Sequence, residues 1–221
     1  MERMLTYLEI AAFIASLLAL KTIWRTPALR IFPLLLGLVA IVETYEEFFA
    51  NNTSPVNVNV YNIQVPLQHL LYLVIIYFSL GNKRYRKYIL FFIITFIVAA
   101  IALTLFASVN NRFNAKVYCV GAIYIVCSIV LKFYDMLQNP ADFNFLRNPF
   151  FYMLFAYLLF LVGTLPYFTM SNWLYFVKGY KTTVQMLVYV STVLNIILYS
   201  TYTIAFLWMT RKKDFYLSVQ P

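Results

Sequence analysis

The sequence predicts an all-α protein that crosses a membrane several times. The chain has 221 residues, of which 63% are hydrophobic and only 11% are charged, whereas about a quarter of the residues in a typical soluble domain are charged. Its apolar runs each approach the roughly 20 residues that a helix needs to cross a bilayer. The stretches between them are too short for a separate soluble domain of about 50 residues. We therefore expect one transmembrane domain over residues 1–221.

Seven segments have the length and composition of a spanning helix. The first follows a single arginine and carries no small-residue cleavage pattern, so we interpret it as a span rather than a removable signal peptide. Pro33, Pro66 and Pro166 fall inside spans and predict kinks, because neighbouring helices can satisfy the freed carbonyls. The predicted spans are residues 5–24, 29–49, 61–80, 88–107, 116–137, 150–170 and 183–209.

The basic residues predict the orientation of these spans. Eleven Lys and Arg residues fall in one set of loops and the C-terminal tail, against five in the other set, and loops rich in Lys and Arg stay cytoplasmic. Lys132, at the inner end of the fifth span, would extend its side chain to the same face. We expect the N-terminus outside and the C-terminus inside. The net charge of +9 then follows from orientation, and we predict no nucleic-acid partner beside the lipid bilayer.

Three carboxylates lie near the end of the second predicted span. Glu46 lies three residues after Glu43, and Glu47 lies four residues after it. All three therefore share an arc of about 100° on a helix. A charged side chain at mid-membrane costs about 3 kcal/mol, and such residues usually face a bundle interior or a watery cavity. We expect Glu43, the deepest, to face the interior. Solvation at the membrane interface is an equal alternative for Glu46 and Glu47.

Polar stripes from four predicted spans meet at one depth. The second span runs outward and the third runs inward, which brings Glu43 and Glu47 level with Gln64, Gln68 and His69. The first span adds Glu9, and the seventh brings its own polar residues toward the same layer. The sequence therefore predicts an outward-facing polar pocket. Its predicted ligand-binding residues are Glu9, Glu43, Glu47, Gln64, Gln68, His69, Tyr72, Gln185, Tyr189 and Asn195.

His69 is the only histidine of the chain. Beside carboxylates it could bind a divalent metal ion or act as a proton-linked switch, whereas a purely structural histidine would be hydrogen-bonded to a carboxylate or amide. No metal-motif spacing is present, so we predict neither a metal site nor a cofactor. Asn195 has a similar alternative, since asparagines in spans often join helices by hydrogen bonds.

Several activities of membrane proteins lack their residues here. The last predicted span contains no lysine, which excludes a retinal Schiff base at that place. A single histidine cannot build the three-histidine metal set of seven-helix hydrolases. No serine lies in a nucleophile-elbow pattern such as G-x-S-x-G. We predict no catalytic residue, and enzymatic activity has no support in the sequence.

Four runs of the chain carry short motifs at fixed places in the predicted spans. These are LVAIVETYEEFFANN, VYNIQVPLQHLLY, LRNPFFYMLFAYLLFLVGT and NIILYSTYTIAFLWMTRKK. They resemble a group of small bacterial seven-helix integral membrane proteins, which share an internal Glu, an Asn-rich loop, a Tyr-Asn-Ile entry to the third span, an Arg/Lys-x-Pro-Phe entry to the sixth and an Asn-Ile-x-x-Tyr stretch in the seventh. The resemblance implies seven helices and a place in the bacterial inner (cytoplasmic) membrane, but no activity. Where the group carries an acid in the third span, this chain has Gln68 and His69.

These observations favour a sensor or receptor that binds a small or lipidic ligand in the outward pocket. The longest predicted inner segments are about a dozen residues, so signalling would need a cytoplasmic or membrane partner. Two alternatives remain. A small transporter would use the carboxylates and His69 to couple its substrate to protons, and a structural subunit of a membrane complex would use its aromatic surface as an interface.

Overall fold

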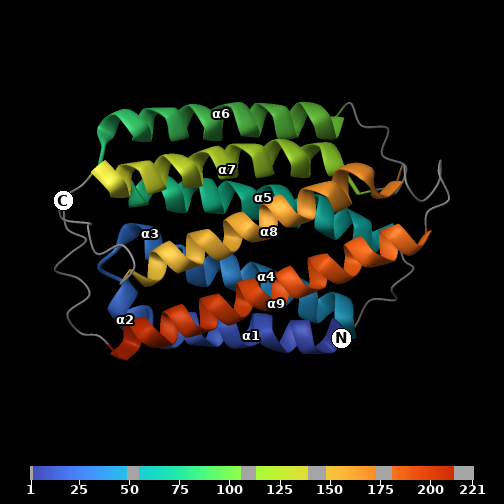
Figure 1. Ribbon diagram of the computed structural model, residues 1–221, viewed down its shortest axis with the longest axis horizontal. Coiled ribbons are helices and arrows are strands. Elements are labelled where there is room, and N and C mark those ends of the chain that lie inside the picture. The colour runs from blue at the N-terminus through green and yellow to red at the C-terminus, as the bar shows by residue number, and fades with distance from the viewer. Residues whose placement is uncertain (1, 49–54, 106–112, 139–147, 173–180, 212–221) are drawn as a thin grey trace.

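The protein is a bundle of helices that run back and forth along one long axis (Figure 1). The computed structural model describes residues 2–48, 55–105, 113–138, 148–172 and 181–211. Within these ranges there is no strand, so the prediction of an all-α fold is confirmed. The helices are α1 (Glu2–Leu18), α2 (Leu20–Ile23), α3 (Pro27–Arg30), α4 (Phe32–Phe48), α5 (Pro55–Ser79), α6 (Lys83–Leu105), α7 (Ala115–Gln138), α8 (Pro149–Asn172) and α9 (Lys181–Arg211).

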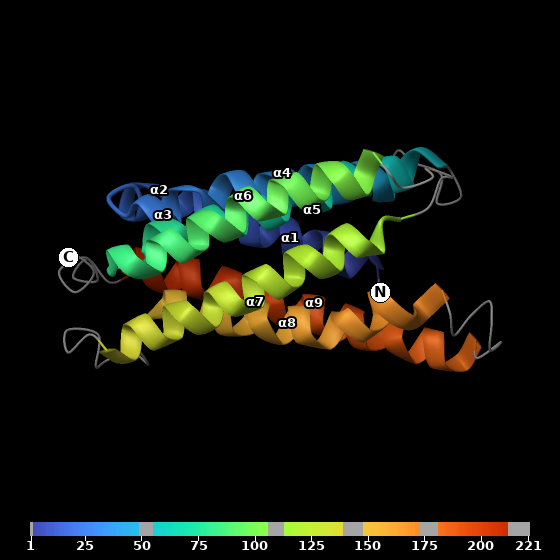
Figure 2. The ribbon, with the colours of Figure 1, turned by 90° about the horizontal axis from the view of Figure 1, so that it is seen from above.

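Six long helices enclose the core, and α6 lies outside them. Helix α1 packs against α4, α4 against α5, α5 against α7, α7 against α8, α8 against α9, and α9 returns to α1. Helix α6 packs against α5 and α7 only at the edge of this ring. Viewed from above, α4, α5 and α6 form one layer and α7, α8 and α9 the other (Figure 2). Helices α9, α1, α4 and α5 follow one another around this ring, and the candidate site lies among them.

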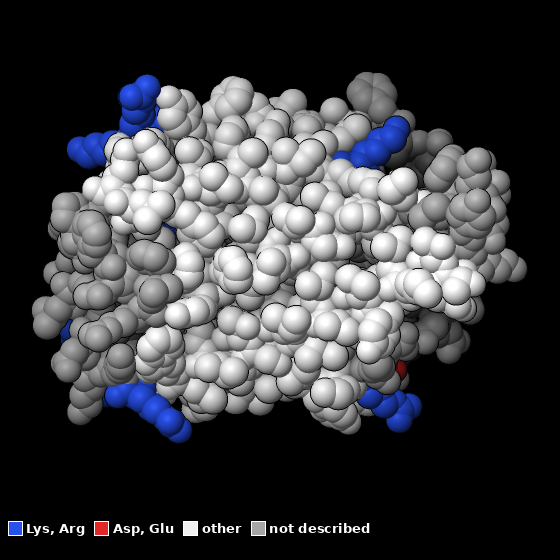
Figure 3. Space-filling view, viewed as in Figure 1, with Lys and Arg blue, Asp and Glu red and all other residues white. Residues whose placement is uncertain are grey.

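Among the described residues, six helices are long and apolar enough to cross a membrane, as expected of a multi-pass membrane protein. They are Pro27–Phe48, Asn59–Ser79, Lys83–Leu105, Ala115–Gln138, Pro149–Met170 and Gln185–Arg211. The visible face carries Lys and Arg only near its two ends, with an uncharged band between them (Figure 3). The predicted first span, residues 5–24, is divided into α1 and the short α2, and α1 has 17 residues. A count of seven spans therefore stays a prediction.

The three prolines lie within helices that continue past them. Pro66 lies inside α5 and Pro166 inside α8. Pro33 is the second residue of α4, a position where the missing N–H costs little because the first turn of a helix has no internal partner for it. The predicted spans therefore end at the loops and not at their prolines.

An aromatic cluster fills the middle of the ring. The Phe32 ring meets those of Tyr72, Tyr202 and Phe206 edge to face, with centroids 5.8–6.3 Å apart. Tyr72 also stacks on Tyr157 at 3.6 Å, and its hydroxyl shares a hydrogen bond of 2.8 Å with that of Tyr202. Buried hydroxyl groups are costly unless they are paired. The Tyr72–Tyr202 bond therefore both satisfies two buried groups and joins α5 to α9.

Candidate functional site: a buried acidic cluster

Glu9, Glu43 and Glu46, the acidic cluster, lie at the end of the bundle where α1 begins and α4 ends. Glu9 is 3% exposed and Glu46 is 7% exposed, while Glu43 is half-buried. The carboxyl group of Glu43 interacts electrostatically with those of both Glu9 and Glu46. Carboxylates are rarely buried without a basic partner, so their grouping inside the bundle requires an explanation.

The packing of α1 against α4 brings these carboxylates to one depth. The two helices are antiparallel neighbours, and an ion pair joins the start of α1 to the end of α4, with Arg3 Nε 3.1 Å from Glu47 Oε1. Glu9 then lies two turns inside α1, and Glu43 lies one turn inside Glu47. Arg3 is exposed and pairs with Glu47 at the rim, and within the described ranges no salt bridge reaches the acidic cluster itself.

Two tyrosines bring further helices to the acidic cluster. The Tyr61 hydroxyl of α5 donates a hydrogen bond of 3.1 Å to Glu43 Oε2, and it interacts electrostatically with all three carboxyl groups. Tyr199 of α9 is buried and lies within electrostatic range of Glu9, Glu43 and Tyr61. The site is therefore shared by α1, α4, α5 and α9.

Three buried oxygens on this side of the core have no hydrogen-bond donor among the described residues. They are Glu9 Oε2, Glu46 Oε1 and Gln64 Oε1. Gln64 is 4% exposed and lies one turn after Tyr61, on the stripe of α5 that faces α4 and α9 through Tyr61 and Tyr72. An unsatisfied buried acceptor costs about 1–3 kcal/mol, and more when it is charged. Ionised carboxylates and the amide carbonyl only accept hydrogen bonds, so the site in its ionised form is short of donors.

Gln68 and Tyr72 continue the same stripe toward the middle of the membrane. Tyr72 is 1% exposed, and its hydroxyl interacts with Gln68 as well as with Tyr202. One polar column inside the bundle is therefore formed by side chains spaced three, four and four residues apart, namely Tyr61, Gln64, Gln68 and Tyr72. At the end of the column near Tyr72, the polar groups bond to partners within the chain. At the end near Tyr61, the column reaches the acidic cluster.

His69 lies on a different face of α5. Its ring is 6.0 Å from that of Phe96 on α6 and 5.2 Å from that of Tyr118 on α7, and it packs against Gly121. Successive residues on a helix point about 100° apart, so His69 faces α6 and α7 while Gln68 faces the polar column. The structure does not bring His69 to Glu43. No three His, Cys, Asp or Glu side chains in the described ranges could hold a metal ion.

The polar residues of α9 that we predicted for the site lie elsewhere. Gln185 and Tyr189 are exposed, and the Asn195 amide donates to the Ser191 carbonyl of its own helix at 3.1 Å. Tyr199 takes their place, one helical turn beyond Asn195. Its position four residues after Asn195 on the same face was the signal that could have found it.

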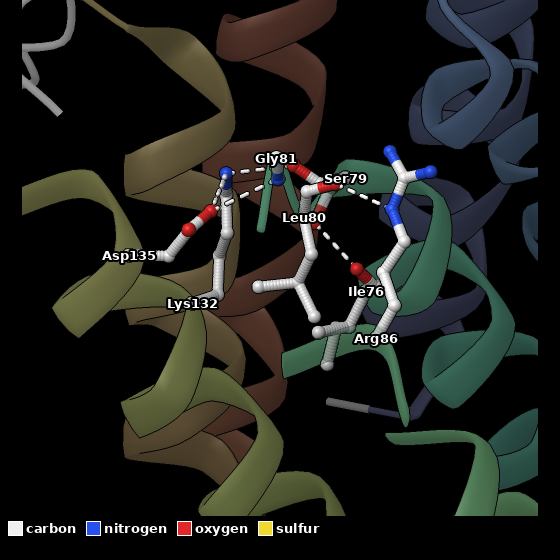
Figure 4. Close-up of polar contacts among 7 residues, drawn as sticks. All are labelled: Ile76, Ser79, Leu80, Gly81, Arg86, Lys132 and Asp135. Atoms are coloured by element: carbon white, nitrogen blue, oxygen red, sulfur yellow. Dashed lines mark hydrogen bonds and ion pairs between the residues drawn. The ribbon is translucent and has the colours of Figure 1, made fainter. Parts of the chain in front are cut away.

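A second buried polar cluster lies at the opposite end of the bundle (Figure 4). Lys132 and Asp135 are 7% and 5% exposed, with Lys132 Nζ 3.5 Å from Asp135 Oδ2. Lys132 donates to the Ser79 carbonyl at 2.7 Å, and Asp135 accepts from the Gly81 amide at 3.1 Å. Helix α7 thereby holds the turn from α5 to α6 through Lys132 and Asp135.

Two further bonds complete this turn. Arg86 Nε donates to the Leu80 carbonyl at 2.7 Å, and the Ser79 hydroxyl donates to the Ile76 carbonyl at 2.8 Å (Figure 4). The last carbonyls of a helix have no partner within it, so these donors cap α5. Opposite charges and satisfied carbonyls indicate a structural role for this end. The acidic cluster, with one sign of charge and unsatisfied acceptors, does not fit such a role.

No family model, curated protein or solved structure matches this chain.

Proposed function

We propose that this protein is a seven-helix membrane receptor that binds a small or lipidic ligand at the acidic cluster and passes the change to a cytoplasmic or membrane partner. The observation that carries the proposal is the set of buried acceptors on α1, α4 and α5 that have no donor among the described side chains, in a site that α9 also borders. A ligand that supplies donors would satisfy groups that are costly to leave unpaired, and it would do so at the meeting point of four helices.

The distribution of basic side chains supports an outward-facing site. Arg3 and Lys116 lie at the end of the bundle that holds the acidic cluster. The other described Lys and Arg side chains lie at the opposite end, which by the positive-inside rule is the cytoplasmic one; they are Lys21, Arg25, Arg30, Lys83, Arg84, Arg86, Lys87, Lys132 and Arg211. With α1 as the first of seven spans, the N-terminus is outside. The resemblance to small bacterial seven-helix proteins supports the bacterial inner membrane as the location.

Helix α9 is the element we propose to transmit the change. It packs against α1 and α8 and borders the acidic cluster with Tyr199. One turn further inward, its Tyr202 is bonded to Tyr72 of α5. A shift of α9 at the outer end must therefore repack the aromatic cluster or move the inner end near Arg211, because packed cores respond in discrete steps. A partner that contacts the inner end would sense this movement.

A proton-coupled transporter is the second candidate. Glu9 and Glu43 are interacting carboxyl groups on neighbouring helices, and no basic side chain forms a salt bridge with either in the described ranges. Ionisable residues inside membrane proteins often mark proton pathways. In this reading the same carboxyl groups carry protons with the substrate, and net flux distinguishes it from a receptor.

Thermal unfolding of the protein in lipid nanodiscs tests the receptor proposal. A library of small metabolites and lipids is screened against the wild type, Glu43→Gln and Glu47→Gln. A ligand present at 100 times its Kd stabilises the folded state by about 2.7 kcal/mol. We expect at least one compound to raise the Tm of the wild type and of Glu47→Gln, whose carboxylate is paired with Arg3 at the rim, but not that of Glu43→Gln.

Two results would contradict the receptor. Compounds that raise the Tm of Glu43→Gln as much as that of the wild type would show that binding does not use the acidic cluster. Uptake of a binding compound into proteoliposomes, driven by a pH gradient and lost in Glu43→Gln, would identify a transporter instead.

A further inference from the structure

The atoms that the acidic cluster offers to a ligand are nearly all acceptors. Glu9 Oε2, Glu46 Oε1 and Gln64 Oε1 are buried and have no hydrogen-bond partner in the part of the chain that the structure describes. The Tyr61 hydroxyl, one of the donors at the site, is already engaged by Glu43. A ligand that binds here by hydrogen bonds must therefore bring several N–H or O–H groups of its own.

The charge of the carboxylates determines which sign of charge a ligand of this site can carry. Three carboxyl groups lie together in a protein interior, and the salt bridges of the described residues join Arg3 to Glu47 and Lys132 to Asp135 but none to the acidic cluster. Removing a charge from water is costly unless an opposite charge accompanies it. An anionic ligand would add to the repulsion, whereas a cationic one would neutralise it.

The spacing of the acceptors favours an organic cation over a metal ion. A metal ion needs several ligand atoms within one coordination sphere, at about 2–2.6 Å from it, and the described residues contain no such group of carboxylates. The free acceptors are instead spread over three helices, α1, α4 and α5. An ammonium group with three N–H donors can reach separate acceptors, and aromatic neighbours such as Tyr61 and Tyr199 are recurrent partners of ligand ammonium groups.

We propose that the ligand of the acidic cluster is an organic amine, bound as its ammonium form by Glu9, Glu43 and Glu46 with Gln64 as an additional acceptor. This inference rests on the proposed receptor function and specifies its ligand class. The ammonium nitrogen replaces the missing donors, and its charge offsets that of the carboxylates. The remainder of the ligand extends from the outer end of the polar column.

The test compares compounds that have similar carbon chains but different polar head groups, one cationic, one neutral and one anionic. Hexylamine, hexan-1-ol and hexanoate share one carbon chain, and spermidine and phenethylamine extend the amine set. Binding to the full-length protein in nanodiscs is measured by thermal shift and by calorimetric titration. We expect at least one of the three amines to bind the wild type, with hexan-1-ol and hexanoate inactive. Glu9→Gln and Glu43→Gln should weaken amine binding by about tenfold or more, the loss expected for one charged hydrogen bond.

Two controls exclude simpler explanations. Glu47→Gln removes a carboxylate from the same helix but leaves the acidic cluster intact, so its amine affinity should stay near that of the wild type. Exchange of potassium chloride for sodium chloride, without amine, should leave the Tm unchanged. A sodium-dependent shift that is lost in Glu43→Gln would overturn the amine assignment in favour of a metal cation.

Other results separate this inference from the proposed receptor. If none of the amines binds, or if they bind Glu9→Gln and Glu43→Gln as tightly as the wild type, the amine assignment is wrong. If hexanoate, hexan-1-ol or another library compound then binds in a Glu43-dependent manner, the acidic cluster is still a ligand site and only the ligand class fails. If no compound shows dependence on Glu43, both proposals fail.

Discussion

Replacing Lys132 by methionine is expected to lower the free energy of unfolding by about 3–5 kcal/mol, the usual cost of removing one partner of a buried ion pair. The variant leaves the Asp135 carboxylate, 5% exposed, without its opposite charge. It also removes the donor to the Ser79 carbonyl at the end of α5. Methionine keeps most of the apolar stem, so the loss reports the charge and the hydrogen bond rather than a cavity.

Reversible unfolding in mixed detergent micelles measures this loss. Lys116→Met on the same helix is the control, since Lys116 is exposed and the change should cost less than about 0.5 kcal/mol. The double variant Lys132→Met with Asp135→Leu should lose less free energy of unfolding than the two single variants lose in sum. Replacing a whole buried pair by apolar residues is often neutral. A Lys132→Met variant as stable as the control would contradict the structural role of this turn.

Gly121→Ala should lower the free energy of unfolding by about 1–3 kcal/mol, the usual cost of overpacking. A Cβ atom at Gly121 would lie 2.9 Å from His69 Cγ and 2.9 Å from Phe96 Cε2. Both atoms belong to buried rings held between α5, α6 and α7. Because both rings are enclosed by neighbouring side chains, we expect the added methyl group to push the helices apart.

Gly163→Ala on α8 is the matched comparison for this variant. Its Cβ would meet Leu194 Cδ1, the end of a flexible side chain that can change rotamer. We expect a smaller loss for Gly163→Ala than for Gly121→Ala when both are unfolded under the same conditions. Adding His69→Ala to Gly121→Ala should recover part of the loss if the His69 ring is the obstacle. Equal losses for the two glycines, or no recovery, would show that the ring contacts do not limit the packing.

The sequence predicts the depth of the site in the membrane. It predicts only partly which neighbouring helix each of the site's side chains faces. The positions of Glu9 and Glu43 in antiparallel neighbouring helices place them at one level, and the structure brings them together. The stripe of Tyr61, Gln64 and Tyr72 also follows from helical spacing alone. Which neighbour a stripe faces depends on the order of the helices around the ring, and this order comes from tertiary packing.

His69 and Tyr199 show this limit. His69 has the depth of Glu43 but lies one residue beyond Gln68, and α6 and α7 cover that face of α5. Tyr199 borders the acidic cluster because α9 returns beside α1, a contact between the two ends of the chain that no local pattern reveals. The first span was harder to define for a different reason, since the helix is interrupted at Ala19 between α1 and α2.

Labelling of single cysteines in intact cells tests most directly the central claim that the acidic cluster lies at the outer face of a seven-span bundle. In a background with Cys119→Ala and Cys127→Ala, which removes both free thiols, one cysteine is placed at Met4, Asn59 or Lys83, all exposed. We expect a membrane-impermeant maleimide to label Met4→Cys and Asn59→Cys from outside, and Lys83→Cys only after permeabilisation. Outside labelling of Lys83→Cys with protection of Asn59→Cys, or labelling that places Met4 and Asn59 on opposite sides, would contradict the account.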